Sequence, residues 1–138
     1  MPGVQLENVW AWLCRPDLWP TWYPNSSNVK IKNQTQTDLR LGTQFRWKTF
    51  GVTIDSTVLE FLQHERLAWD AHCNGVHAYH AWAMERRDGG VYVLTEETQN
   101  GWKAWLGSKV LPSRMQSWHQ RWLAELEEVA KSGMPRAE

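Results

Sequence analysis

The stretch that decides the fold is LAWDAHCNGVHAYHAWAMERRDGGVYVLTEET, from Leu67 to Thr98. Apolar and polar residues alternate along most of it, which is the period typical of a half-buried strand. Two turn signals, Asn74-Gly75 and Asp88-Gly89-Gly90, divide it into three parts. Asn-Gly readily adopts the positive backbone angles of a two-residue hairpin turn. The stretch therefore predicts three consecutive strands of an antiparallel meander.

A second alternating segment precedes this stretch. Residues 41–58 alternate between apolar and polar positions and turn near Gly51, which predicts a further hairpin. A short strand is expected over residues 29–32. The sheet should therefore continue toward the N-terminus beyond the meander.

Helical signals come first in the chain. A short helix is expected over about residues 8–14, with Asn8 as its N-cap and Pro16 as its end. The aromatic segment 17–24 is punctuated by prolines and is readable as a second short helix or as a tight loop.

The C-terminal region has a different period. After Asn100-Gly101 apolar residues recur every three or four positions, which predicts one long amphipathic helix. Pro112 is expected to kink this helix or to open its main portion. The apolar stripe must be buried, and its members are Leu111, Met115, Trp118, Trp122, Leu126 and Val129. Short helices, antiparallel strands and a long helix, in that order, predict an α+β fold with the helix against one sheet face.

Composition limits the class of protein. The chain has 138 residues, enough for one domain with a real core. It carries 15 basic and 15 acidic residues, and zero net charge removes the electrostatic basis of nonspecific nucleic-acid binding. Without a membrane-length apolar run or a signal-peptide pattern, we expect a cytoplasmic protein with no membrane span. Cys14 and Cys73 are too few for a disulfide framework. The 11 tryptophans are an excess that needs a location.

Several residue groups resemble those of a known superfamily. They are Val9-Trp10 at a helix start, Trp19-Pro20 with Trp22, Leu41-Gly42-Thr43, Phe50-Gly51-Val52, Leu67-Ala68-Trp69, His80 with Trp82, Thr95-Glu96-Glu97 before Gly101, and His119 with Trp122-Leu123. In this order they resemble the SRPBCC or START-like (Bet v 1-like) superfamily, near its polyketide cyclase/dehydrase-type members. The resemblance covers nearly the whole chain and implies a single START-like domain over residues 1–138.

The resemblance also implies a helix-grip fold. In that fold a curved antiparallel β-sheet wraps around a long C-terminal helix and encloses a hydrophobic cavity, and two short helices lie near the N-terminus. The superfamily includes lipid carriers, cyclases, hormone receptors and chaperone activators, so the fold alone does not name a function.

The chain departs from this superfamily at its first strand. Members usually begin with a strand of several residues, whereas here only residues 1–7 precede the first expected helix. A shortened first strand leaves a sheet edge less protected. Pairing of that edge between two copies, as a homodimer, is a hypothesis that follows from the truncation.

Hairpin geometry assigns the inward side chains of the meander. A two-residue turn at Asn74-Gly75 places His80 on the largely apolar inward face. His80 then lies opposite Glu97 if the next turn is Asp88-Gly89, and diagonal to Glu97 if it is Gly89-Gly90. A buried imidazole and carboxylate must satisfy one another or contact a ligand or water. The pair is readable as a polar couple that orders the sheet, as a general acid/base pair, or as an anchor for the polar end of a ligand.

Potential metal ligands gather between residues 72 and 80, but the strand period separates them. His72 and His77 face outward, whereas Cys73 and His80 face inward, so neither face offers the three or four ligands that zinc prefers. We therefore expect no functional metal. His119 lies one step from the helix stripe, and a helix-surface position is favoured over the cavity rim. No cofactor signature occurs, and no cofactor is expected.

The predicted cavity face supplies the candidate site residues. His80 and Glu97 are the candidate catalytic residues. Trp22, together with Trp19, is readable as an aromatic gate at the cavity mouth or as a plug of the helix–sheet junction. The candidate ligand-binding residues are Trp22, Trp47, Trp69, His80, Trp82, Met84, Thr95, Glu97, Met115, Trp118 and Trp122.

Three functions follow from this arrangement. The leading hypothesis is binding of a hydrophobic small molecule between the sheet and the C-terminal helix, for which aromatic and polycyclic compounds are candidates. One alternative is a cofactor-independent, polyketide cyclase- or dehydratase-like enzyme that uses His80 and Glu97. A further alternative is an adaptor similar to the Hsp90-activator branch of the superfamily, which would act through its outer surface.

Overall fold

The computed structural model describes residues 1–33, 35–100 and 112–136, with side chains from residue 116 onward in the last segment. Within these segments six strands form one antiparallel sheet in the order β1-β2-β3-β4-β5-β6. The strands are β1 (Ser27–Ile31), β2 (Gln44–Thr49), β3 (Val52–Leu62), β4 (Arg66–Cys73), β5 (Val76–Arg87) and β6 (Gly90–Asn100). The helical elements are α1 (Leu6–Leu13), the 3-10 turn η1 (Pro16–Leu18), α2 (Trp19–Trp22) and α4 (Pro112–Lys131). Neighbours in sequence are neighbours in the sheet, so the predicted meander is confirmed.

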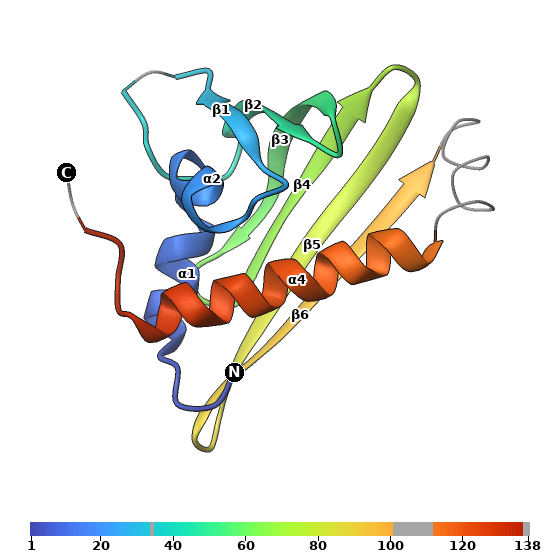
Figure 1. Cartoon of the computed structure of the whole chain (residues 1–138). Helices are drawn as coiled ribbons and strands as arrows, with labels where there is room; N and C mark the ends of the chain where they lie inside the picture. The colour runs from blue at the N-terminus through green and yellow to red at the C-terminus, as the bar shows by residue number, and fades with distance from the viewer. Residues whose placement is uncertain (34, 101–111, 137–138) are drawn as a thin grey trace.

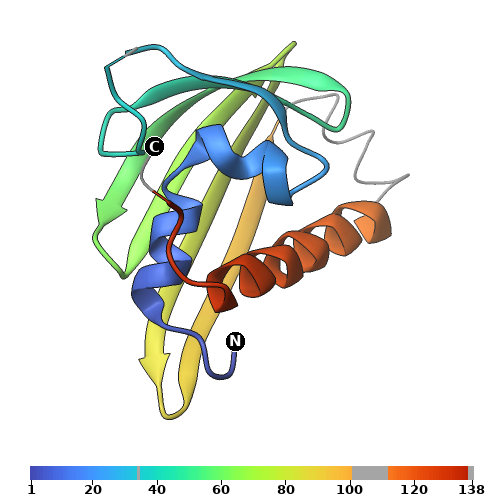
Figure 2. The same ribbon diagram turned by 60° about the vertical axis from the view of Figure 1, so that its left-hand side comes forward.

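The helices lie on the concave side of the curved sheet, and α4 runs across it (Figures 1 and 2). The C-terminal part of α4 is tied to α1, because the Asn8 side-chain amide donates a hydrogen bond to the Ala130 carbonyl (3.0 Å). The Trp12 indole N–H donates to the Gly133 carbonyl (2.7 Å) just beyond the helix. This arrangement is an α+β fold, as the sequence pattern predicts, and it is the helix-grip fold that the superfamily resemblance implies.

Two tight turns set the register of the last three strands. Asn74 and Gly75 have φ values of 43° and 79°, the left-handed conformation that their hairpin turn requires. The following hairpin closes through Asp88-Gly89, the first of the two turns considered. His80 therefore lies directly opposite Glu97. The inward and outward faces of these strands are those that the alternation predicts.

Much of the tryptophan excess lies in one aromatic core. Trp19 is fully buried, and its indole N–H donates to the Leu13 carbonyl (3.0 Å). Its ring contacts those of Phe45, Trp47, Trp69 and Trp122, at centroid distances from 5.2 to 5.8 Å. Trp19 therefore packs the junction between helices and sheet as a plug. Trp22 is buried beside Tyr23, with ring centroids 6.3 Å apart.

The first helix differs from its prediction. It begins at Leu6, and the residue before it, Gln5, makes no side-chain capping bond. Asn8 was expected to cap this helix but lies inside it, and its amide instead bonds to Ala130 of α4. The segment read as a helix or a loop contains both η1 and the short α2. A capping residue and an interhelical donor have the same sequence pattern, so local sequence did not separate them.

The alternating segment 41–58 also begins later than its pattern indicates. Leu41 lies before β2 and is 67% exposed. Gly42 has a φ of 79°, and Thr43 N–H donates to the Arg40 carbonyl (3.0 Å), so this part of the chain turns. α4 begins at Pro112, in keeping with the expectation that this proline opens a helix, while Leu111 lies outside the described residues.

The N-terminal residues cover one end of the β6 edge. Pro2 forms an isolated bridge with Gly90, and Val91 N–H donates to the Met1 carbonyl (3.1 Å). A Cβ at Gly90 would clash with that carbonyl oxygen, so the close approach requires glycine. In the described residues the expected first strand is thus reduced to a single bridge.

The rest of β6 offers a pairing edge. From Val93 to Asn100, β5 is its strand partner within the described ranges. We expect this edge to pair with a second copy, because unpaired backbone groups of an edge strand template strand addition. Light scattering on a concentrated sample should give twice the chain mass. The mass of a single chain at the highest soluble concentration would refute this pairing.

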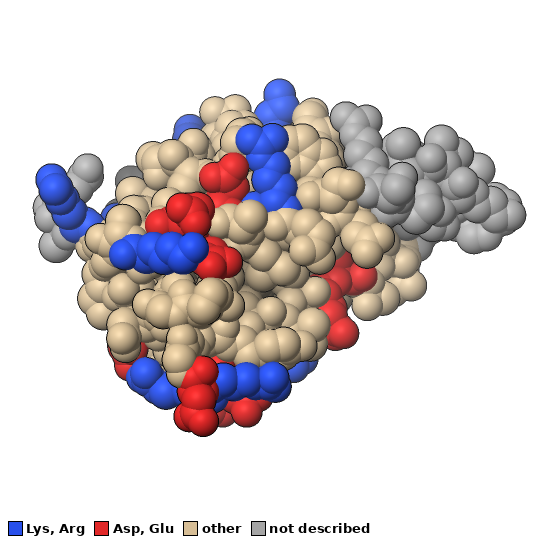
Figure 3. Space-filling model, turned by 60° about the horizontal axis from the view of Figure 1, so that its bottom comes forward, with Lys and Arg blue, Asp and Glu red and all other residues tan. Residues whose placement is uncertain are grey.

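Charged groups of both signs are intermixed on the surface. On the face drawn in Figure 3, basic and acidic side chains lie next to one another. Lys131, for example, pairs with Glu127 and Glu128 at 3.0 Å each, and Arg86 pairs with Glu7. Among the described helices, none is long and apolar enough to cross a membrane.

Candidate functional site

A cavity of about 800 Å³ lies between the concave face of the sheet and α4. Its walls come from β2 to β6, from the segment after α2, and from α4. Most of the wall is apolar, and aromatic rings form a large part of it. Six of the predicted site residues line the cavity: Trp47, Trp69, His80, Glu97, Trp118 and Trp122.

The other predicted site residues lie elsewhere. Trp82 and Met84 are buried on the inward face of β5 but do not line the cavity, because the sheet there is packed under the helices. Trp22 is buried away from the cavity wall, and Thr95 lies behind His80. The Met115 side chain falls outside the described part of the chain. Residues that the prediction did not include also line the cavity, among them Tyr23, Ile54 and Cys73.

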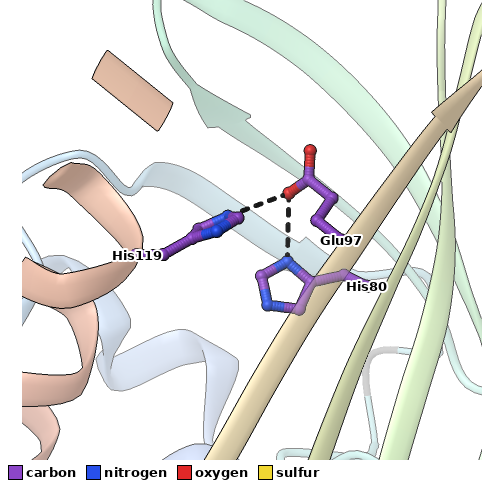
Figure 4. Close-up of side chains that lie close together, drawn as sticks. All are labelled: His80, Glu97 and His119. Atoms are coloured by element: carbon purple, nitrogen blue, oxygen red, sulfur yellow. Dashed lines mark hydrogen bonds and ion pairs between the residues drawn. The ribbon is translucent and has the colours of Figure 1, made fainter. Parts of the chain in front are cut away.

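Three polar side chains converge on the cavity wall, as Figure 4 shows for His80, Glu97 and His119. Nδ1 of His80 lies 3.3 Å from Oε2 of Glu97. Nε2 of His119 lies 3.2 Å from the same oxygen. The exposed fractions of the three side chains are 5%, 13% and 18%, respectively. The carboxylate therefore joins a strand residue and a helix residue in a nearly buried cluster.

His119 corrects the prediction of a helix-surface histidine. It lies on α4 three residues before Trp122, which packs against the sheet, so the two side chains share one helix face. The same spacing was present in the sequence and could have placed His119 on the buried face of the helix, although not beside Glu97. The stripe was defined by apolar residues alone, and for that reason a histidine at its margin was assigned to the surface.

The strand side of the cluster is held rigidly. The His80 ring stacks on Trp69 of the neighbouring strand and on Trp82 of its own strand, with centroid distances of 5.0 and 5.3 Å. Its Nε2 lies 2.8 Å from the Thr95 hydroxyl oxygen. On the other side, the Gln99 amide donates to the second oxygen of Glu97. Each of these contacts restricts the direction in which a donor atom points.

Burial and pairing act in opposite directions on the two strand residues. Burial lowers the pKa of His80, and the Glu97 carboxylate offsets part of this effect. Burial on its own would raise the pKa of Glu97, but hydrogen bonds from His119 and His80 outweigh it and hold that pKa well below its usual range. Glu97 is therefore an ionised carboxylate inside a largely apolar cavity.

The cavity wall also carries an unpaired donor. Trp122 is 2% exposed, and its indole N–H has no hydrogen-bond partner within the described residues. A buried donor without a partner costs about 1–3 kcal/mol. The indole nitrogen has almost no accessible surface, so this cost belongs to the packing of α4 and not to the cavity surface.

A second hollow, of about 780 Å³, lies near the start of α1 and the outer side of β5 and β6. It is bordered by exposed Leu62, Tyr92 and Leu94, and by Arg66 and Arg86, which form surface ion pairs with glutamates. The converging polar side chains lie in the first cavity. We therefore regard that cavity as the candidate functional site.

Comparison with known proteins supports the fold. No protein-family model and no curated protein matches the chain. Two solved structures with similar folds are the di-domain ARO/CYC BexL of the BE-7585A biosynthetic pathway and the di-domain ARO/CYC StfQ of the steffimycin biosynthetic pathway. BexL has 14% identity and a TM-score of 0.64, and the match covers 99% of this chain and 48% of BexL. StfQ has 12% identity and a TM-score of 0.66, and the match covers 95% of this chain and 47% of StfQ.

A third structure is more similar in sequence. Hypothetical protein jhp0584 from Helicobacter pylori has 33% identity and a TM-score of 0.87. The match covers 94% of this chain and 83% of that one. Sequence identity of this degree over most of both chains indicates a common family and not only a common fold. The chain belongs to the same family as jhp0584.

Proposed function

We propose that this protein binds a hydrophobic small molecule with an aromatic or polycyclic body in the cavity between the sheet and α4. The size and the lining of the cavity support the proposal. Its volume of about 800 Å³ lies within the range of small-molecule sites, roughly 300–1,000 Å³. Apolar walls with a few convergent polar groups are the usual composition of such sites.

The wall chemistry supports a ligand with one polar end. Rings of Trp47, Trp69 and Trp122 offer flat apolar surfaces on which planar ligand rings can stack. Glu97 with its two histidines offers the site for a polar group. We assign the protein to the START-like (SRPBCC) superfamily on the same grounds, with the helix-grip fold and the fold-level likeness to the ARO/CYC proteins as support.

A cyclase- or dehydratase-like activity is a second candidate. The 3.3 Å contact between His80 and Glu97 inside the cavity favours it, since a general acid/base group must lie within reach of its partner and of the substrate. The two candidates differ in the fate of the bound molecule. A binding protein releases the molecule unchanged, whereas an enzyme releases a product of different mass or isomeric structure.

Native mass spectrometry of protein purified from its source cells tests the proposal. We expect a mass increment of one small molecule per chain that is lost on denaturation. In parallel, the dye 1-anilinonaphthalene-8-sulfonate, which has an aromatic body and one anionic sulfonate, should bind saturably, with one dye per chain, and the extracted compound should displace it. Repeated absence of the increment together with non-saturable dye binding would refute the proposal.

A further inference from the structure

The His80–Glu97–His119 cluster has the composition of a metal-ligand set. Two imidazole nitrogens and one carboxylate oxygen, all within 4.8 Å of one another, can each offer one ligand atom to the same ion. We propose that these three residues bind one divalent transition-metal ion, with zinc as the representative of the class. Two histidines and one glutamate are an established protein ligand set for zinc, which leaves a fourth position open.

The spacing of the donor atoms fits this coordination. Zinc lies about 2.0–2.1 Å from its nitrogen and oxygen ligands, so two ligands of a tetrahedral site are roughly 3.3 Å apart. In the cluster, Nδ1 of His80 and Nε2 of His119 lie 3.3 and 3.2 Å from Oε2 of Glu97. Each nitrogen thus lies at the ligand-to-ligand separation of such a site from the shared oxygen, and the three atoms together lie within 4.8 Å of one another. Small movements of the side chains would place one ion among the three atoms.

The surroundings of the ligands also fit. Metal-bound histidines usually donate the N–H of their second nitrogen to an oxygen, which fixes the ring. The second nitrogen of His80 lies 2.8 Å from the Thr95 hydroxyl oxygen, and its ring is stacked on Trp69. The second oxygen of Glu97 accepts a hydrogen bond from Gln99. These contacts therefore fix the orientation of the His80 and Glu97 side chains.

The open coordination position has a defined direction. All three ligands line the cavity, so the side of the ion without protein ligands would face the cavity interior. A water molecule or the polar end of the bound molecule would complete the coordination. This last step rests on the proposed ligand-binding function, whereas metal binding itself does not.

Two histidines on the outer face of the sheet provide a matched control. His72 and His77 lie opposite one another on the outer face of β4 and β5, with ring centroids 4.3 Å apart, and His72 also contacts Asp70. An adventitious ion would be held there as readily as in any exposed histidine pair. A His72→Gln/His77→Gln double variant removes that pair without touching the cavity.

Metal titration of tag-free protein tests the proposal. The protein is stripped with a chelator, and Zn²⁺ is titrated in competition with a chromophoric chelator. We expect one Zn²⁺ per chain, a loss of affinity of about 100-fold or more in Glu97→Gln and in His119→Gln, and an unchanged affinity in the His72→Gln/His77→Gln variant. No Zn²⁺ binding by the parent protein, or loss of binding only in the outer-face variant, would overturn the site.

A second measurement needs no cavity variant, so it remains decisive if the cavity variants do not fold. X-ray absorption of the zinc-loaded His72→Gln/His77→Gln variant, which lacks the outer-face pair, should show nitrogen and oxygen neighbours at about 2.0–2.1 Å, with the outer-shell pattern of two imidazoles. A spectrum without imidazole neighbours would refute the assignment. Dye titration of the stripped protein separates the two proposals: saturable binding without zinc affinity refutes the metal site alone, and zinc affinity without saturable dye binding refutes the ligand cavity alone.

Discussion

Replacement of Trp122 by alanine should lower the free energy of unfolding by about 3–5 kcal/mol. Trp122 is the point at which α4 meets the aromatic core. Its ring stacks on Tyr23 with a centroid distance of 4.4 Å and an interplanar angle of 4°. It also contacts rings from the sheet, at 5.1 Å for Trp82 and 5.9 Å for Trp47. Truncation would remove all of these contacts at once and leave a cavity beneath the helix.

The cause of this loss is well defined. The Trp122 indole N–H has no partner within the described residues, so no protein hydrogen bond in that part of the chain is broken with the ring. Urea unfolding followed by far-ultraviolet circular dichroism measures the change without relying on tryptophan fluorescence. Trp118→Ala is the matched control, because Trp118 lies one turn earlier and is only partly buried. Equal losses in the two variants, or a loss below about 1 kcal/mol for Trp122→Ala, would contradict this account.

Replacement of Ala78 by phenylalanine should weaken binding of 1-anilinonaphthalene-8-sulfonate by at least about 10-fold, which corresponds to about 1.4 kcal/mol. Ala78 lies on β5, pairs with Ala71 of β4, and lines the cavity. A phenyl group at this position would occupy space that the ligand needs. Fluorescence titration of the dye measures the change in dissociation constant.

A control on the neighbouring residue separates filling of the cavity from damage to the strand. His77→Phe introduces the same side chain one residue earlier, where it is exposed on the outer face. Dye binding should be unchanged in this variant. Equal weakening in both variants would count against the cavity as the dye site. An adaptor that acts through its outer surface would instead tolerate Ala78→Phe and be impaired by His77→Phe.

The strand part of the candidate site follows from local sequence. His80 lies opposite Glu97 because two short turns, Asn74-Gly75 and Asp88-Gly89, each fix the register of one hairpin. The conformation of a tight turn depends on a few adjacent residues, so it can be read without knowledge of the rest of the chain. The same argument predicted that His72 and His77 would face away from the cavity.

The contact between His119 of the helix and Glu97 could not be predicted from local sequence. His119 reaches Glu97 only because α4 lies across the concave face with Trp122 directed at the aromatic core. Helical periodicity indicates which residues share a face, but not where along the sheet that face docks. The metal prediction considered only residues 72–80 and did not weigh the His80, Glu97 and His119 group, because a group divided between two strands and a distant helix has no local spacing.

The cavity, too, could be predicted only in part from local sequence. Alternation and turn chemistry were sufficient to predict the meander, the inward face with Trp69 and Trp82, and the long amphipathic helix. They could not distinguish residues that line an open space from residues packed solidly, and so Trp69 and Trp82 were grouped together although only Trp69 borders the cavity. Local backbone preferences depend on a few adjacent residues, so they can be inferred from the sequence alone. The distance between the helix and each strand depends on how side chains far apart in sequence fill the space between them, and that packing determines where a cavity opens and which polar groups meet in it.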